Sequence, residues 1–384
     1  MLECQKHLFA LDPDITYLNS ASISAIPFAV EQAGAAGVAV KVKPWRRDLA
    51  AADRVVEETR QAAADLIGAR ADDIAIIGAV SYGIATVCAN TRMAPGARIL
   101  LLDGEHSSLI LCWSAFARDT GAVLDFVARP ADGDWTAAVL EAVERPGAPP
   151  IGIAALTPLI WSDGALVDLA DIAPVLRRRG VPLLIDATQA VGVMPIDVKL
   201  LQPDFLVFPS YKWVLGPYGL AFLYVAPHRQ SGRPLEEHAG NRRGVDLPGA
   251  GPVETLPFLD GARRFDRGER DSFITIPMVH AGLRLIATFG RDRIEERLRH
   301  LTDRFADRIA DLPLRFPPRH ARVPHIIGLR FPGTLPEGIV ERMAAERIFV
   351  SLRGGGLRIS PHVYNDDADL DRCADWLRGN ALGR

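Results

Sequence analysis

Short apolar runs alternate with longer amphipathic segments through the first two thirds of this 384-residue chain. The runs are hydrophobic on both faces, as expected of parallel strands that are covered by helices on both sides of a sheet. We expect strands at 97–103, 150–156, 181–186, 204–209 and 219–225. Amphipathic helices are expected between them at 135–144 and 168–179, the second ending at Gly180. This alternation predicts an α/β sheet.

The pattern changes after residue 228. Residues 228–261 are rich in Gly, Pro and Arg and show little periodicity, which predicts a long excursion over the surface. Helices are expected from about 275 and at 293–310. Short strands are expected at 326–331, 348–352 and 356–360. The C-terminal part therefore predicts a second, smaller α+β domain.

Composition excludes several classes of protein. A formal net charge of −3 gives no overall field for nucleic acid or an anionic membrane. No apolar stretch reaches the roughly 20 residues that span a bilayer, and the N-terminus does not resemble a signal peptide. The four cysteines are Cys4, Cys88, Cys112 and Cys373. They form no C-x-x-C pair, and none lies at metal-ligand spacing from a His. We expect a cytoplasmic protein without a metal site.

Two polar residues follow apolar strands in the middle of the chain. V-P-L-L-I-D-A-T-Q (181–189) delivers Asp186 at a strand end, and F-L-V-F-P-S-Y-K-W-V-L-G-P-Y-G (205–219) delivers Lys212. Apolar surroundings disfavour the ammonium form of a lysine, which is what a Schiff-base nucleophile needs. Taken alone, Asp186 could cap a helix, and Lys212 could be an ordinary surface lysine.

Two weaker motifs lie upstream. A-V-S-Y-G-I-A-T-V (79–87) is a small-residue turn into an apolar helix, whose first N–H groups can hold a phosphate. D-G-E-H-S-S (103–108) places His106 at a strand end. Phosphate cradle, aromatic ring, carboxylate and lysine follow one another in the order of a pyridoxal 5′-phosphate (PLP) site. In this interpretation Asp186 keeps the pyridine nitrogen protonated. The phosphate contacts are expected from Val80, Ser81, Tyr82 and Ser210.

These motifs resemble the class V aminotransferase branch of fold-type I PLP enzymes, which includes cysteine desulfurases, kynureninases and isopenicillin N epimerases. The resemblance runs from Y-L-N-S-A (17–21) to G-L-R-I-S-P-H-V-Y-N-D-D (356–367). It implies a large α/β domain with a mostly parallel seven-stranded sheet and a smaller α+β C-terminal domain. The implied boundaries are an arm at 1–16 that joins the small domain, a PLP-binding domain at 17–270 and a small domain at 271–384.

The resemblance also implies roles for individual residues. Lys212 is similar to the lysine that carries PLP as an internal aldimine, and Asp186 to the partner of the pyridine nitrogen. Gln189 matches the residue at the ring hydroxyl, and His106 the histidine that stacks on the ring. Arg358 matches the arginine that binds the substrate α-carboxylate, a task suited to a bidentate guanidinium. Asn19 falls in the family's substrate-proximal N-terminal segment.

The chain departs from the family pattern at several positions. Residues 348–360 contain no cysteine and leave no room for the catalytic cysteine loop of desulfurases, so persulfide chemistry is not expected. Tyr211 precedes the lysine where desulfurases have His, which is closer to kynureninases. Trp161 stands where relatives carry an Asn that faces the substrate. It would reshape the substrate pocket or serve in packing.

A second departure concerns the contact between subunits. The resemblance implies a homodimer in which a Gly-Thr pair reaches the phosphate of the neighbouring subunit; here the pair is Gly268-Glu269. A carboxylate beside a phosphate is repulsive unless Arg267 or Arg270 intervenes. Either these arginines contact the phosphate, or the segment serves the substrate. The arginines of 228–261 point to a substrate with more negative charge than a plain amino acid.

The sequence thus predicts a PLP-dependent enzyme that acts on an amino acid or a similar molecule through a Lys212 aldimine and loss of the Cα proton. An aminotransferase is the leading hypothesis. A lyase, an epimerase or a carbon–carbon bond-forming enzyme of the same family is the alternative. A catalytically silent PLP-fold binding protein is the alternative from another class.

Overall fold

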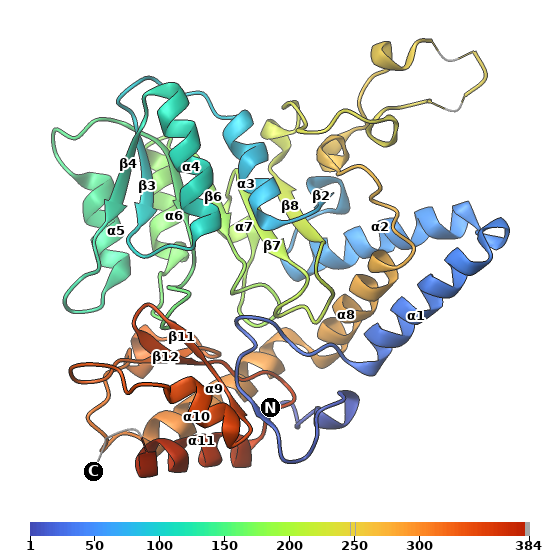
Figure 1. Ribbon diagram of the computed structural model, residues 1–384. Helices are drawn as coiled ribbons and strands as arrows, with labels where there is room; N and C mark the ends of the chain where they lie inside the picture. The colour runs from blue at the N-terminus through green and yellow to red at the C-terminus, as the bar shows by residue number, and fades with distance from the viewer. Residues whose placement is uncertain (246, 250, 381–384) are drawn as a thin grey trace.

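A seven-stranded sheet forms the centre of the computed structural model, which describes residues 1–245, 247–249 and 251–380 (Figure 1). Its strand order is β2-β8-β7-β6-β5-β3-β4, and β8 runs in the direction opposite to the other six strands. The strands are β2 (Ile74–Ile77), β3 (Arg98–Leu102), β4 (Val123–Val127), β5 (Ile151–Leu156), β6 (Leu183–Asp186), β7 (Phe205–Pro209) and β8 (Ala221–Val225). The predicted α/β fold with a mostly parallel seven-stranded sheet is confirmed.

Helices cover both faces of this sheet, which explains why its strands are apolar throughout. On β3, Ile99 and Leu101 belong to the same buried cluster as side chains of α3 and α4, whereas Leu100 and Leu102 belong to the cluster of α5 and α6. The helices are α3 (Val80–Ala89), α4 (Ser107–Thr120), α5 (Trp135–Glu144), α6 (Leu169–Arg178) and the short α7 (Val198–Leu201). Alternate residues of each strand therefore face different helices.

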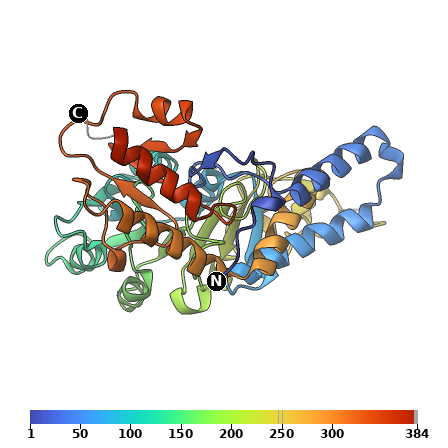
Figure 2. The same ribbon diagram turned by 90° about the horizontal axis from the view of Figure 1, so that it is seen from below.

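Two long helices that the sequence analysis did not predict project from the side of the sheet (Figures 1 and 2). They are α1 (Phe28–Val42) and α2 (Leu49–Leu66), and both pack against α8 (Thr275–Phe289). Gly37 of α1 permits a close approach, because a Cβ atom there would lie 2.2 Å from the carbonyl oxygen of Phe273. The small residues of α1 give no clear apolar stripe, so this helix has little periodic signal in the sequence.

The C-terminal part contains a small antiparallel sheet of order β11-β12-β9 and a two-stranded pair of β1 with β10. The strands are β1 (Thr16–Tyr17), β9 (Ile327–Leu329), β10 (Ile348–Phe349), β11 (Ser351–Arg353) and β12 (Gly356–Ile359); the helices are α9 (Arg291–Arg308), α10 (Ile339–Ala345) and α11 (Asp367–Asn380). The single strand expected at 348–352 is thus two strands in different sheets.

The N-terminal arm contacts this C-terminal part. The N–H of Leu2 donates to the Arg293 carbonyl, and the N–H of Gln5 donates to the Val363 carbonyl. The three-part division into 1–16, 17–270 and 271–384 stays a prediction, and residues 381–384 lie outside the described residues. No helix in the described part of the chain is long and apolar enough to cross a bilayer.

The predicted excursion at 228–261 contains short 3-10 turns but neither α-helix nor strand in its described residues; 246 and 250 lie outside them. Three of its four arginines form ion pairs within the chain, whereas Arg233 is exposed. Arg229 pairs with Asp204, Arg242 with Glu237 and Arg243 with Asp260. These ion pairs weaken the expectation that the excursion supplies positive charge to a substrate.

Candidate active site

The predicted chemical groups meet at the carboxyl end of the parallel strands. Because β3, β6 and β7 run parallel, the segments that follow them reach the same edge of the sheet, where α/β proteins bind ligands. A cavity at this edge is lined by seven of the candidate site residues, Val80, Ser81, His106, Trp161, Asp186, Gln189 and Lys212, and also by Tyr211. The structure thus brings together side chains that are up to 132 residues apart in sequence.

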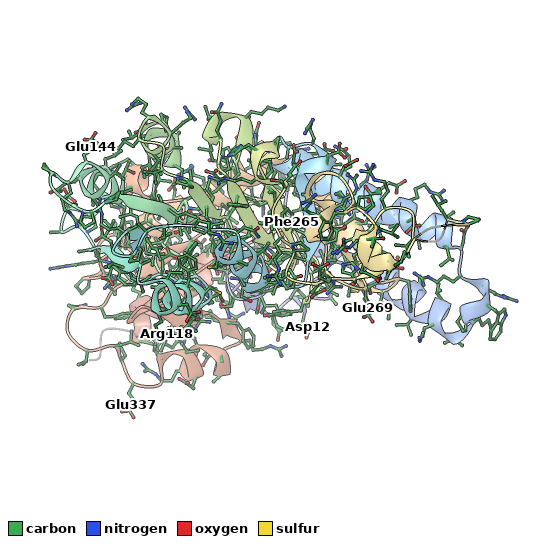
Figure 3. All side chains as sticks on the ribbon, turned by 90° about the horizontal axis from the view of Figure 1, so that it is seen from above. Asp12, Arg118, Glu144, Phe265, Glu269 and Glu337 are labelled. Carbon is green, nitrogen blue, oxygen red and sulfur yellow. The ribbon has the colours of Figure 1, made fainter. Side chains whose placement is uncertain are left out.

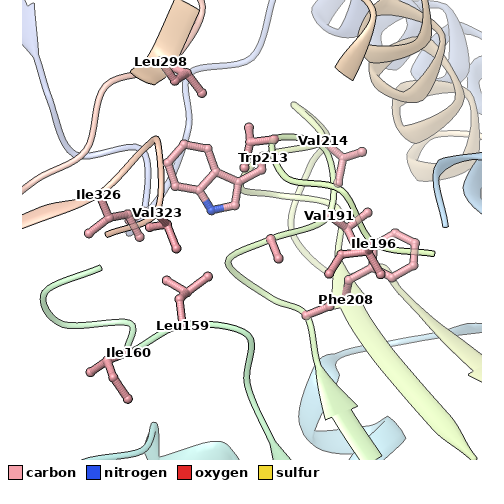
Figure 4. Close-up of a cluster of buried hydrophobic side chains, with 14 of the residues drawn as sticks. Leu159, Ile160, Val191, Ile196, Phe208, Trp213, Val214, Leu298, Val323 and Ile326 are labelled. Carbon is pink, nitrogen blue, oxygen red and sulfur yellow. The ribbon is translucent and has the colours of Figure 1, made fainter. Parts of the chain in front are cut away.

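Lys212 is buried, with 7% of its surface exposed. Burial lowers the pKa of its ammonium group to about 7, and the positive charges of Arg358 and Arg353 contribute to the decrease. The adjacent Trp213 is enclosed by apolar side chains that include Leu159, Leu298 and Ile326 (Figure 4). This packing holds the backbone next to Lys212 in place.

Asp186 lines the same cavity as Lys212. It is also buried, with 5% of its surface exposed. Its Oδ1 accepts a hydrogen bond of 2.9 Å from the N–H of Thr188. Burial raises the pKa of Asp186, while the Thr188 hydrogen bonds and the Lys212 charge oppose the increase. A cationic partner such as a protonated ring nitrogen would stabilise the ionised form of a carboxylate in this environment.

Gln189 is held by two neighbours. Its Oε1 accepts from Trp213 Nε1 at 2.8 Å, and its Nε2 donates to the Ala21 carbonyl at 3.0 Å. An amide NH₂ group has two hydrogens, so one remains for a ligand in the cavity. Trp213 therefore orients the amide of Gln189 as well as anchoring Lys212.

The N-terminus of α3 offers backbone donors to the cavity. Its N-cap residue, Ala79, makes no side-chain capping bond, and Gly78, Val80 and Ser81 line the cavity. The first N–H groups of a helix have no partner within the helix and attract anions. Arg267 lies close by, since a Cβ atom on Gly78 would be 3.9 Å from its Nη1. The phosphate cradle predicted from 79–87 thus has a cation of the same chain beside it.

The segment after Arg267 turns away from the cradle. The N–H of Gly268 donates to Glu236 Oε2 at 2.6 Å, and Arg270 pairs with Asp266 and donates to the Gly240 carbonyl. Glu269 is exposed, on the side of the molecule where the α1–α2 hairpin projects (Figure 3). Of the two arginines considered from the sequence, the structure places Arg267 rather than Arg270 at the cradle.

Two predicted phosphate contacts do not lie in the cavity. Ser210 is buried, and its hydroxyl is within 2.6 Å of the Pro217 carbonyl and 2.9 Å of the Leu220 carbonyl, so its hydrogen is used inside the turn. The Tyr82 hydroxyl lies near Glu236, whose charge adds to the effect of burial in raising the pKa of the phenol. Neither residue lines the cavity. The phosphate contacts of Ser210 and Tyr82 therefore stay predictions, and in this structure both hydroxyl groups face other parts of the protein.

Glu105 and Thr157 are site residues that the sequence analysis did not select. Thr157 Oγ1 donates to Glu105 Oε1 at 2.7 Å, and both residues line the cavity. Burial raises the pKa of Glu105 to about 8, so the carboxyl group is mostly neutral at pH 7. Its neighbour His106 has a lowered pKa, chiefly through burial. Glu105 is adjacent to His106 in the same motif, and this was the available signal.

Arg358, on β12 of the small sheet, does not line the cavity itself but contacts Trp161, which does. This arginine is 1% exposed, and it donates to the Trp161 carbonyl at 3.0 Å and to Ser22 Oγ at 2.7 Å. Burial lowers the pKa of Arg358 to about 9. The Trp161 ring stands edge-on to His106, with centroids 5.3 Å apart, and its Nε1 donates to the Gly104 carbonyl. Trp161 therefore forms a wall between His106 and Arg358.

Asn19 lies beside Ser360 of the C-terminal part rather than in the cavity. It forms a bridge with Ser360, and its side-chain Oδ1 is buried without a hydrogen-bond partner in the described structure. The segment that follows Asn19 supplies Ser22 to the arginine. The N-terminal segment thus approaches the site through Ser22, whereas Asn19 itself does not line it.

The cysteines lie outside the cavity. Cys88 and Cys112 are on α3 and α4, Cys373 is buried on α11, and Cys4 is in the N-terminal arm. None of the four lines the cavity. Among the described residues, no group of His, Cys, Asp and Glu is arranged to hold a metal ion.

Comparisons with known proteins bear on the whole chain. The family model for class-V aminotransferases matches residues 17–372. The chain is 26% identical over 383 residues to the isopenicillin N epimerase of Streptomyces clavuligerus, covering 96% of this chain and 95% of the relative. It is 25% identical over 342 residues to a probable cysteine desulfurase of Pyrococcus abyssi, covering 82% and 80%.

Solved structures show the same fold. A lysine-to-alanine mutant of C-DES with glycine covalently linked to its PLP cofactor superimposes with a TM-score of 0.87 at 21% identity, covering 97% of this chain and 98% of the other. The apo cysteine desulfurase of Thermococcus onnurineus gives a TM-score of 0.84, also at 21% identity, and 99% of each chain is covered. With the family match over 17–372, these findings confirm the predicted family, fold and cofactor: the chain belongs to the class-V aminotransferase family of fold-type I, PLP-dependent enzymes.

Proposed function

We propose that this protein acts on an amino acid or a similar molecule with PLP attached to Lys212 Nζ, and that it is an aminotransferase. The observation that carries the proposal is a buried lysine with a pKa near 7 in one cavity with a buried aspartate. A neutral amine is the form of lysine that attacks a carbonyl group. Burial provides this form near neutral pH.

The residues of the cavity fit the cofactor. Asp186 is a buried carboxylate suited to a protonated pyridine nitrogen, and the free amide hydrogen of Gln189 suits an oxygen on the ring. The α3 N-terminus, with Arg267 nearby, suits the phosphate. His106 lies on the wall of the same cavity, where its ring can stack on another ring.

Bound PLP supplies an electron sink that makes the Cα proton of an amino acid acidic. Lys212 Nζ, whose pKa is about 7, can accept that proton and return it to another atom. Arg358, whose guanidinium contacts Ser22 and the Trp161 carbonyl, would bind the α-carboxylate and so orient the substrate. Trp161 closes one wall and helps to exclude water.

The residues that line the cavity around Lys212 bear on which PLP-dependent reaction the protein catalyses. Because no cysteine lines the cavity, a persulfide-forming desulfurase is disfavoured. Transfer of an amino group needs only the lysine, the cofactor and a site for two successive acids. A lyase or epimerase would use the same groups. We further propose a homodimer, as the family resemblance implies, and a cytoplasmic location.

The cofactor site can be tested by visible absorbance of the purified protein. We expect a band from bound PLP in the wild type and in Lys199→Ala, which removes an exposed lysine of α7. Lys212→Ala should lose the covalently attached cofactor. Retention of borohydride-reducible PLP by Lys212→Ala would sink the proposal.

A second experiment separates the reactions. An aminotransferase mixed with an amino acid alone should lose the visible band, release one equivalent of 2-keto acid, and recover the band when a 2-keto acid is added. A lyase should recover the band without an added acceptor. An epimerase should exchange the Cα proton with solvent deuterium and release no keto acid. Bound cofactor with no response to any amino acid would instead support the silent binding protein.

A further inference from the structure

Two arginines of the β11–β12 hairpin converge on one hydroxyl group beside the cavity. Arg353 Nη2 donates to Ser22 Oγ at 3.1 Å, and Arg358 Nη2 donates to the same oxygen at 2.7 Å. The strand register explains this. Arg358 pairs with Ser351, and Arg353 stands two residues beyond Ser351, so both side chains leave the same face of the sheet. Two positive charges are therefore held together at one atom.

Neither guanidinium has a carboxylate partner in the described structure. The other acceptors are backbone carbonyls: Trp161 for Arg358 and Leu352 for Arg353. Arg358 Nε is buried without any hydrogen-bond partner among the described residues. Two guanidinium groups that contact the same hydroxyl oxygen repel each other, and the repulsion is stronger where water is excluded. Both arginines also lower the pKa of Lys212, so their charges act on the cavity.

The two arginines differ in depth. Arg358 is 1% exposed, in the middle of its strand, whereas Arg353 is half-buried and adjoins the turn at Gly354-Gly355. A ligand whose α-carboxylate is bound by Arg358 would bring only a more distant group to Arg353. The guanidinium fork binds carboxylates in a bidentate manner, which suits both positions.

We propose that Arg353 binds a second anionic group at the end of the substrate side chain, so that the substrate is an amino acid with an acidic side chain. The inference rests on the proposed function, in which Arg358 binds the α-carboxylate. Arg353 then determines substrate specificity, and Ser22 holds the two guanidinium groups in position when no substrate is bound.

The test is a titration of the PLP-loaded protein, followed by the change in visible absorbance. The probes are L-aspartate, L-glutamate and L-2-aminoadipate, which differ in side-chain length, with L-asparagine and L-glutamine as neutral counterparts of the first two. The wild type should bind at least one acidic amino acid about tenfold or more tightly than the neutral probes. Arg353→Gln should weaken that binding by about tenfold to a hundredfold and leave the neutral probes unchanged.

Two further variants make the result specific. Arg353→Lys keeps the charge and should retain part of the preference. Arg118→Gln removes one charge from the exposed end of α4 and should behave as the wild type. Equal weakening of acidic and neutral probes by Arg353→Gln, or no acidic preference in the wild type, would overturn the inference. Failure of the proposed function is a separate outcome, because no Lys212-attached cofactor would then be found.

Discussion

Two buried arginines of this protein have opposite surroundings. Arg60 of α2 is fully buried and donates to both carboxylate oxygens of Asp266, at 2.9 and 2.8 Å, and to the Ile74 carbonyl. Arg358 of β12 is 1% exposed, yet it contacts a hydroxyl and a carbonyl and has no ion pair in the described structure. The first arginine has its anion within the fold. The second lacks one.

The difference separates a structural charge from a functional one. Burial acts to lower the pKa of both arginines; at Arg60 the charge and hydrogen bonds of Asp266 outweigh burial and raise the pKa, whereas the pKa of Arg358 is lowered to about 9. A buried charge without a partner costs free energy, and the cost is recovered only when an anion binds. We therefore expect changes at Arg60 to act on stability and changes at Arg358 to act on ligand binding.

The largest expected effect is on stability, from Asp266→Asn. It removes the buried anion of Arg60, which keeps the ion pair with Glu57, and replaces one of the two accepting carboxylate oxygens by an NH₂ group that cannot accept, so we expect a loss of about 3–5 kcal/mol in the free energy of unfolding. Denaturant unfolding measures it. Asp375→Asn, which breaks an exposed ion pair with Arg308, should cost less than about 1 kcal/mol. Similar losses of stability for both variants would contradict the assignment of Arg60 and Asp266 as a pair that stabilises the fold.

Arg358→Gln should show the opposite balance. It removes a buried charge that has no ion-pair partner, so the free energy of unfolding should change by no more than about 1 kcal/mol, while affinity for amino acids falls by about a hundredfold. Unfolding and absorbance titration of the same preparation measure the two quantities. A large stability loss with intact binding would assign Arg358 to the fold instead.

The pH dependence of the cofactor-free protein should reveal Lys212. Its folded-state pKa of about 7 lies below the usual 10.5, so between these values the unfolded chain binds more protons and stability rises with pH. We expect a gain of about 1–2 kcal/mol from pH 7 to 8.5, relative to Lys212→Met measured in parallel. Identical curves for the two proteins would contradict a lowered lysine pKa.

Glu105 should give a smaller effect of opposite sign. Its folded-state pKa of about 8 lies above the usual 4.5, so the folded protein binds more protons in this range and stability falls as pH rises. Relative to Glu105→Gln, the wild type should lose about 1 kcal/mol between pH 6 and 7. Thermal unfolding at the two pH values measures it. An equal change in stability for the two proteins between these pH values would show that the carboxyl group of Glu105 is already ionised.

The central sheet could be predicted because both-face burial leaves a strong mark in the sequence. All five strands expected in the first two thirds occur, as do the helices at 135–144 and 168–179. The short strand β2 and the partly exposed β4 were missed. The helix α1 was missed because its close contact with Phe273 depends on small residues rather than on an apolar stripe.

The cavity residues that follow strands could also be predicted, since topology brings strand ends together. Lys212, Asp186 and His106 belong to this group. Ser210 and Tyr82 do not line the cavity, because the direction of a side chain within a turn or helix depends on local packing, and their phosphate contacts stay predictions. Arg353 was missed for a similar reason: only the register of β11 with β12 brings it beside Arg358.

The most direct test of the central claim, that Lys212 carries the cofactor, is borohydride reduction followed by peptide mass mapping. The chain has five lysines, so the assignment is unambiguous. We expect the added mass of reduced PLP on the peptide that contains Lys212 and on no other. Modification of Lys6, Lys41, Lys43 or Lys199 instead, or of no lysine, would contradict the assignment.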